Sequence, residues 1–308
     1  MPTRRHALLL AGLAFVLAGT SADAQNKPQD KPRDRISVVA TFSILGDLVK
    51  NVGGDRIEVA TLVGPNSDAH VFSPTPADAK TLAKAQLVFV NGLGFEGWMT
   101  RLVRASGTKA PAVIASKGIK TRKMEDEHQH GHMAIDPHAW QSIANVKIYV
   151  ANIRDGLSKA DPAGKGAYDS NARSYLAKLD ELEGEVRAAI GRIPGDRRKI
   201  ITTHDAFGYF SAAYGMEFIS PEGVSTDSEP SAKDVAKIIA QVRRQKIPAV
   251  FMENITDPRL MQQIAKETGA RIGGTLYSDA LSDASGPAGS YIDMMRNNIR
   301  ELNKALTS

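Results

Sequence analysis

The stretch from Lys199 to Ser220 reads KIITTHDAFGYFSAAYGMEFIS and holds one complete strand–helix–strand unit. A short apolar run over Lys199–Thr203 is followed by a helix-like stretch over Ala206–Tyr214 and a second short run over Glu217–Ser220. Short apolar runs that alternate with helices are typical of buried parallel strands in βα units. The stretch therefore predicts an α/β fold and places His204 directly after a strand.

The same alternation extends over most of the chain, in two series. The first series has strand-like runs at Ile36–Ala40, Ile57–Val63, Leu87–Val90 and Ala112–Ala115, and helix-like stretches at Ser43–Asn51, Thr75–Ala85 and Glu96–Ala105. The second series adds strand-like runs at Ala249–Met252 and Ala270–Leu276 and helix-like stretches at Ser231–Gln245 and Asp257–Thr268. Two α/β lobes of about four strands each are therefore predicted.

A long amphipathic segment lies between the two series. Over Asp169–Ile190, apolar residues recur at steps of three and four, which predicts one helix about 33 Å long that ends before Pro194-Gly195. A surface helix would show the same pattern, but the position of this one favours a stiff connector. We therefore expect an N-terminal lobe at 36–166, a linking helix at 167–194 and a C-terminal lobe at 195–308.

The first residues resemble an export signal. Two arginines among the first five residues precede an apolar run over Ala7–Gly19, and Ala22-Asp23-Ala24 follows. This order predicts a signal peptide at 1–24 that is cleaved before Gln25, because the run is shorter than the roughly 20 residues of a membrane-spanning helix. The polar, proline-bearing segment 25–35 is predicted to be a flexible leader. We expect the mature protein in a bacterial periplasm.

The composition excludes several classes of function. The chain has 308 residues and no cysteine, so disulfides, thiolate metal sites, thiol nucleophiles and a lipid anchor on cysteine are not expected. The formal net charge is +5, and no block of five or more basic residues occurs, which argues against nucleic-acid binding.

Three loop histidines and one aspartate are candidate ligands. His70 follows the run that ends at Val63, His138 precedes a helix expected to start near Ile143, and His204 and Asp279 each follow a predicted strand. Ligands bind at the carboxyl ends of strands in open α/β sheets, so these are suitable positions for one site. Each residue alone could equally be a surface histidine or a turn-capping aspartate.

Longer stretches around these residues resemble the zinc and manganese solute-binding proteins of ABC importers, the ZnuA/TroA-like group also called cluster A-I. The stretches are GPNSDAHVFSPTPAD (64–78), DPHAWQ (136–141), THDAFGYF (203–210) and 251–281. The resemblance implies two α/β lobes joined by one long rigid helix, with a metal in the cleft between them held by His70, His138, His204 and Asp279. One departure is Ser73, where the family usually has an acidic residue before proline, and it does not affect a ligand.

The ligand set favours zinc. Three imidazoles and one carboxylate suit tetrahedral Zn²⁺, whereas Mn²⁺ prefers more oxygen ligands and a higher coordination number. In the resembling family the third ligand is often histidine in zinc proteins and glutamate in manganese proteins, and here it is His204. We expect Zn²⁺, with Mn²⁺ as the alternative, and an affinity that falls below about pH 6.5 as the imidazoles become protonated.

Three other segments attract attention. His128, His130 and His132 lie in the short stretch MEDEHQHGH (124–132), which predicts an accessory zinc-binding loop, although a solvated polar loop would look the same. The stretch 92–97 matches G-x-G-x-x-G, but no acidic residue follows at the required distance, so a turn that packs Phe95 and Trp98 is expected. Glu253 ends a strand, and it could contact a ligand histidine or only stabilise a turn.

The leading hypothesis is a monomeric periplasmic protein that captures Zn²⁺ and delivers it to an ABC permease with its ATPase subunit. It performs no catalysis, and a periplasmic metallochaperone could supply its metal. The alternatives are a manganese-binding counterpart, a secreted zinc hydrolase with a His₃ site, and a surface adhesin. A hydrolase needs an open fourth position on the metal and a general base, and no motif for such a base is present.

Overall fold

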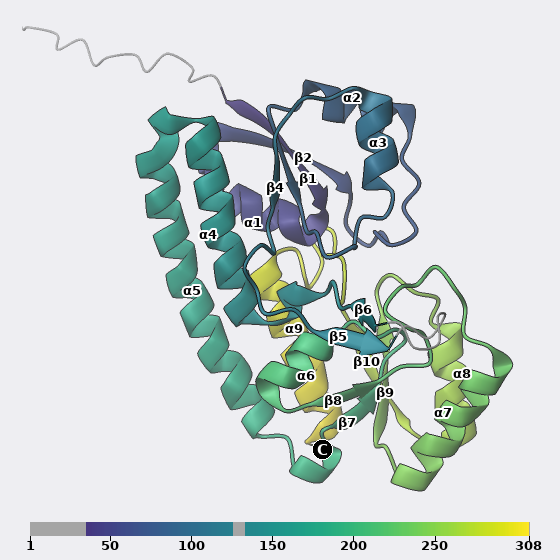
Figure 1. Cartoon of the computed structure of the whole chain (residues 1–308). Coiled ribbons are helices and arrows are strands. Elements are labelled where there is room, and N and C mark those ends of the chain that lie inside the picture. The colour runs from purple at the N-terminus through teal and green to yellow at the C-terminus, as the bar shows by residue number, and fades with distance from the viewer. Residues whose placement is uncertain (1–34, 126–132, 308) are drawn as a thin grey trace, which may run out of the picture. The chain divides into compact units, whose positions relative to one another are not determined.

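The computed structural model describes residues 35–125 and 133–307, and within them two parallel four-stranded sheets form two lobes (Figure 1). The first sheet has the strand order β2-β1-β3-β4 and the second the order β10-β9-β7-β8. The first lobe contains β1 (Ile36–Phe42), α1 (Ser43–Gly53), β2 (Ile57–Val63), α2 (Pro76–Lys84), β3 (Leu87–Val90), α3 (Met99–Ser106) and β4 (Ala112–Ile114). The second contains β7 (Lys199–Ile201), α6 (Gly208–Tyr214), β8 (Glu217–Ile219), α7 (Ala232–Gln245), β9 (Ala249–Glu253), α8 (Arg259–Thr268), β10 (Arg271–Leu276) and α9 (Tyr291–Leu306).

The predicted α/β fold with two four-stranded lobes is confirmed. All eight predicted strands are present, with ends that differ by at most two residues from those expected. Parallel pairing brings the carboxyl ends of β1, β2 and β3 to one edge of the first sheet, and those of β7, β9 and β10 to one edge of the second. The loops that leave these two edges carry the candidate ligands.

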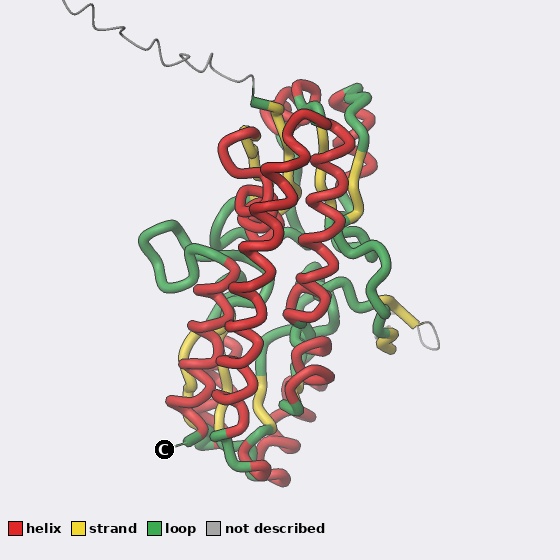
Figure 2. The backbone as a smooth tube through the Cα atoms, turned by 90° about the vertical axis from the view of Figure 1, so that its left-hand side faces the viewer, coloured by secondary structure: helices red, strands yellow, loops and turns green. Residues whose placement is uncertain are grey.

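Two long helices run beside both lobes. In Figures 1 and 2, α4 (Ile143–Ala160) and α5 (Lys165–Gly191) lie side by side, and α5 extends from the first lobe to the second. The α5 helix begins four residues before the expected start at Asp169, because the short 3-10 turn Pro162–Gly164 leads directly into it. One face of α5 is buried along its whole length, which is consistent with a stiff connector.

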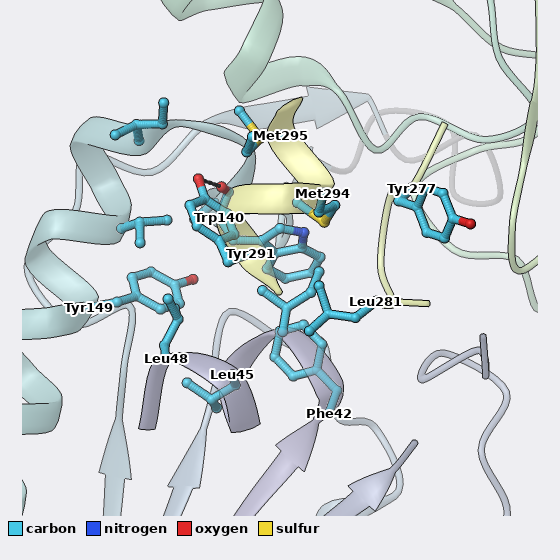
Figure 3. Packing of buried hydrophobic residues seen from close by; sticks show 14 of the residues in the cluster. Phe42, Leu45, Leu48, Trp140, Tyr149, Tyr277, Leu281, Tyr291, Met294 and Met295 are labelled. Carbon is cyan, nitrogen blue, oxygen red and sulfur yellow. Dashed lines mark hydrogen bonds between the residues drawn. The ribbon is translucent and has the colours of Figure 1, made fainter. Parts of the chain in front are cut away.

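The two lobes share one apolar interior. A single cluster of buried side chains continues from the first sheet through Trp140 and Tyr291 to Phe207 and Phe251 of the second lobe. Figure 3 shows Trp140 and Tyr291 between α1 and the methionines of α9. A second, smaller cluster lies under α7 and α8 only. The lobes are therefore joined by packing as well as by the chain.

Two elements of the described structure were not predicted. One is the antiparallel hairpin of β5 (Lys123–Glu125) and β6 (Met133–Ile135), and the other is α9. The start of α9 has a sequence signal, because the Ser290 side chain accepts from the backbone N–H of Asp293 and so caps the helix. The predicted signal peptide 1–24 and most of the leader 25–35 lie outside the described residues.

The glycine-rich stretch 92–97 is a turn, as predicted. Gly92 has a φ of +83°, and a Cβ at this position would lie 2.7 Å from a methyl carbon of Ile114. Phe95 and Trp98 are buried behind the turn. Only glycine fits at position 92, so the motif serves packing rather than a dinucleotide.

Candidate metal centre

The structure brings His70, His138, His204 and Asp279 together between the two lobes. One ligand atom from each of the four lies within 4.8 Å of the others. His70 comes from the loop after β2, His138 from the segment between β6 and α4, and His204 and Asp279 from the loops after β7 and β10. His138, His204 and Asp279 are fully buried, and the His70 side chain is 5% exposed.

Four of the six distances between these atoms are close to the edge of a tetrahedral zinc site. Asp279 Oδ2 lies 3.2 Å from His70 Nε2, 3.6 Å from His138 Nε2 and 3.0 Å from His204 Nε2. The Nε2 atoms of His70 and His138 are 3.2 Å apart. Zinc bonds of 2.0–2.1 Å place tetrahedral ligands roughly 3.3 Å from one another. The four side chains therefore fit a small cation with four ligands.

Buried side chains fix the loops that carry His70 and His138. Asp68 Oδ1 accepts from the His70 backbone N–H at 2.8 Å, and Trp98 Nε1 donates to the carbonyl of Ala69 at 2.8 Å. Asp136 Oδ1 accepts from the His138 backbone N–H at 2.9 Å and lies 3.0 Å from His138 Nδ1. A carboxylate at Nδ1 holds the proton there and directs the Nε2 lone pair to the metal.

Glu253 contacts the loop of a candidate ligand rather than only its own turn. Its Oε1 accepts from the backbone N–H groups of Thr203 (2.8 Å) and His204 (3.0 Å), which fixes the loop after β7. Its Oε2 lies 2.7 Å from His204 Nδ1, so it also faces a candidate ligand.

The contact of Asp136 with His138 was not predicted from the sequence. The position of Asp136, two residues before His138, is the signal that could have indicated it.

The electrostatics of the metal-free site couple these groups. Burial lowers the pKa of His138, but the charges of Asp279 and Asp136 outweigh it and raise the pKa to about 9. Burial also lowers the pKa of His204, and Glu253 and Asp279 more than compensate, so this pKa is well above 6.5. Burial raises the pKa of Asp279, but the two imidazoliums bring it well below its usual value. In the metal-free site His138 and His204 therefore hold a proton more strongly than a free imidazole does.

We expect metal affinity to fall with acidification from about pH 9 rather than from the pH 6.5 expected from the sequence. The metal needs a neutral Nε2, so binding at pH 7 must displace the proton of His138, and that of His204 as well. For each proton displaced, the apparent dissociation constant should rise about tenfold per pH unit below the pKa. Burial lowers the pKa of His70, which therefore adds no proton at this pH.

Calorimetric titration in buffers with different ionisation enthalpies measures the number of protons released. We expect between one and two protons at pH 7. Release of none, together with an affinity that is constant between pH 7 and 9, would contradict this electrostatic description.

Comparison with known proteins identifies the family. Residues 38–305 match the family described as ZnuA, zinc-uptake complex component A, periplasmic. The chain belongs to this family. It is 33% identical over 304 residues to the iron-binding protein YfeA of Yersinia pestis, a match that covers 98% of this chain and 96% of YfeA. It is 31% identical over 309 residues to the manganese ABC transporter substrate-binding lipoprotein PsaA of Streptococcus pneumoniae, covering 98% and 99%.

A solved structure supports the same assignment. The periplasmic zinc binding protein TroA from Treponema pallidum aligns with a TM-score of 0.83 at 31% identity, covering 89% of this chain and 100% of TroA. This ZnuA-family chain is therefore a metal-binding, solute-binding protein of an ABC importer, not an enzyme. Its transport partners are a permease and an ATPase. The hydrolase alternative has no support from the family.

Proposed function

We propose that this ZnuA-family protein captures Zn²⁺ in the periplasm through His70, His138, His204 and Asp279 and delivers it to its importer. The observation that carries the proposal is the meeting of three Nε2 atoms and one carboxylate oxygen, with the oxygen 3.0–3.6 Å from each nitrogen. Four ligands complete a tetrahedron, which suits a metal held for transport more than one that activates water.

The choice of metal rests on the ligands of this chain. The three relatives compared above are named for iron, manganese and zinc, so their names do not decide it. Imidazole nitrogen suits Zn²⁺, whereas Mn²⁺ prefers carboxylate and water oxygens. Only one of the four side chains, Asp279, offers oxygen. Three nitrogen ligands and one oxygen ligand favour zinc, and we expect Mn²⁺ to bind more weakly.

Further parts of the proposal come from the sequence. The protein is exported by a signal peptide at 1–24 and acts as a monomer, and a periplasmic metallochaperone could load it. Its lobes are bounded at 36–166 and 195–308, with the linker at 167–194. Within the described part of the chain, no helix combines the length and the apolar character needed to cross a bilayer.

Competitive titration of the protein starting at Gln25 tests the choice of metal. The stripped protein is offered Zn²⁺ and Mn²⁺ against a chelator of known affinity, and thermal unfolding is followed in parallel. We expect one tight zinc site and easy displacement of Mn²⁺. Zinc at 1,000 times its dissociation constant should stabilise the folded state by about 4 kcal/mol, an increase that a chelator reverses. Equal or tighter binding of Mn²⁺ would contradict the zinc assignment.

Deletion of residues 126–132 separates the main site from the accessory loop. His128, His130 and His132 lie outside the described residues, so their role stays a proposal from the sequence. We expect the deletion to leave the tight zinc site intact and to remove only weak additional binding. Loss of the tight site on deletion would move it to the loop.

A further inference from the structure

One buried carbonyl next to Asp279 receives two hydrogen bonds from the turn that follows His138. Trp140 Nε1 donates to the Ser278 carbonyl at 2.8 Å, and Gln141 Nε2 donates to the same oxygen at 2.7 Å. All three residues are fully buried. A backbone carbonyl has two lone pairs, so the two donors saturate it. The chain thus connects two candidate ligands, 141 residues apart, through the residues directly beside them.

The amide of Gln141 is not explained by stability. Its Oε1 is buried and has no hydrogen-bond partner among the described residues. A buried acceptor without a partner costs free energy that offsets what the bond from Nε2 contributes. An apolar side chain of the same length would avoid that cost. The net contribution of this amide to folding is therefore small.

The loop after β10 makes two further hydrogen bonds to the first lobe. The Leu281 backbone N–H donates to Ser43 Oγ at 3.0 Å, and the Leu281 carbonyl accepts from the Asn66 backbone N–H at 2.8 Å. Asp279 therefore lies between two backbone positions, Ser278 and Leu281, that are both bonded to the first part of the chain. Figure 3 shows Trp140 and Leu281 in this shared interior.

His204 is held differently. Its loop is fastened by Glu253, which ends β9 of the second sheet. The Asp279 loop is bonded to both lobes, because Asn254 Nδ2 of the second lobe also donates to the Ala280 carbonyl at 3.3 Å. The His204 loop is bonded to the end of β9 in its own lobe.

We propose that Trp140 and Gln141 are positioning residues that lock Asp279 to the His138 turn. His138 and Asp279 then form a preassembled pair of ligands, and His70 and His204 complete the site. This inference rests on the proposed metal-binding function and adds to it the residues that set the geometry. Preassembly reduces the ordering that the metal must impose when it binds.

The test replaces Gln141 by methionine, which keeps the length and removes the donor. We expect Gln141→Met to weaken zinc binding about tenfold or more, as is usual when a group that orients a ligand is lost. The melting temperature of the metal-free protein should stay equal or rise. With Co²⁺ as a probe, the visible ligand-field bands should change in position or intensity, which a purely structural role would not cause.

Two further variants make the result specific. Asn152 Nδ2 donates to the carbonyls of Ala115 and Lys117, far in sequence from any ligand loop, so Asn152→Met removes an amide of the same kind and should leave the Co²⁺ bands unchanged. Trp140→Phe removes the other donor and should weaken zinc binding in the same direction. It also decides the question if Gln141→Met does not fold.

Titration of the wild type distinguishes a failure of the positioning role from a failure of the proposed metal-binding function. Tight zinc binding by the wild type, with unchanged affinity and Co²⁺ bands in both Gln141→Met and Trp140→Phe, would overturn the positioning role and leave the metal-binding function intact. Failure of the wild type to bind zinc would overturn the function itself, and the positioning role with it.

Discussion

Replacing Asp279 by asparagine is expected to weaken zinc binding by a factor of about 10²–10³. Structural zinc sites with four ligands bind with about 10–16 kcal/mol, so one ligand accounts for about 2.5–4 kcal/mol. Asp279 also supplies the only negative charge among the four ligands, and its Oδ2 lies within 3.6 Å of all three Nε2 atoms. Asparagine keeps the shape of the side chain and removes the charge. Chelator competition at pH 7.5 measures the change.

Asp283→Asn is the matched control for this variant. Asp283 lies in the same loop, is exposed and contacts the Asn66 side chain rather than a histidine. We expect its zinc affinity to equal that of the wild type. A loss of affinity below tenfold in Asp279→Asn would remove Asp279 from the ligand set.

Replacing Glu253 by glutamine is expected to have the second largest effect, a loss of about 10–100-fold in zinc affinity. The carboxylate lies 2.7 Å from His204 Nδ1, and its charge favours the tautomer with the proton on that nitrogen. An amide N–H₂ in the same place would require Nδ1 to accept, and the proton would move to Nε2, where the metal must bind. The charge that raises the pKa of His204 is lost as well. Between pH 7 and 9 the affinity should therefore rise less steeply than in the wild type, because His138 still releases a proton and His204 releases less.

The exposed residue Glu217 provides the comparison for Glu253. It pairs with Lys199 at the protein surface, and Glu217→Gln should bind zinc as the wild type does. Unchanged zinc affinity of Glu253→Gln at pH 7 would contradict the inference that Glu253 selects the tautomer of His204.

The sequence predicted the sheets well because most of their strands are short apolar runs between helix-like stretches. Ile57–Val63 and Leu87–Val90 have the same limits in the structure as in the prediction, since each is bounded by turn residues. The four candidate ligands were named from a resemblance, and the structure brings them together. Their role in binding a metal remains a proposal.

The contacts that orient the ligands could not be predicted. Ser278 and Gln141 are far apart in the chain, and nothing in either local sequence indicates that one donates to the other. The same holds for Trp98 and Ala69. Such contacts depend on the tertiary packing and not on the local sequence. The α9 helix could have been predicted, because the sequence contains its N-cap residue Ser290 and the apolar residues of its buried face.

The interior shared by the lobes limits how such a protein could serve as a zinc sensor. A wide separation would expose Trp140, Tyr291 and their neighbours to water, at about 1.5–3 kcal/mol for each large side chain, against a total stability of about 5–15 kcal/mol. The distance between a pair of fluorophores placed on the two lobes would therefore change little when the metal binds. A single environment-sensitive dye on the loop that carries His204, beside the second sheet, is the better reporter.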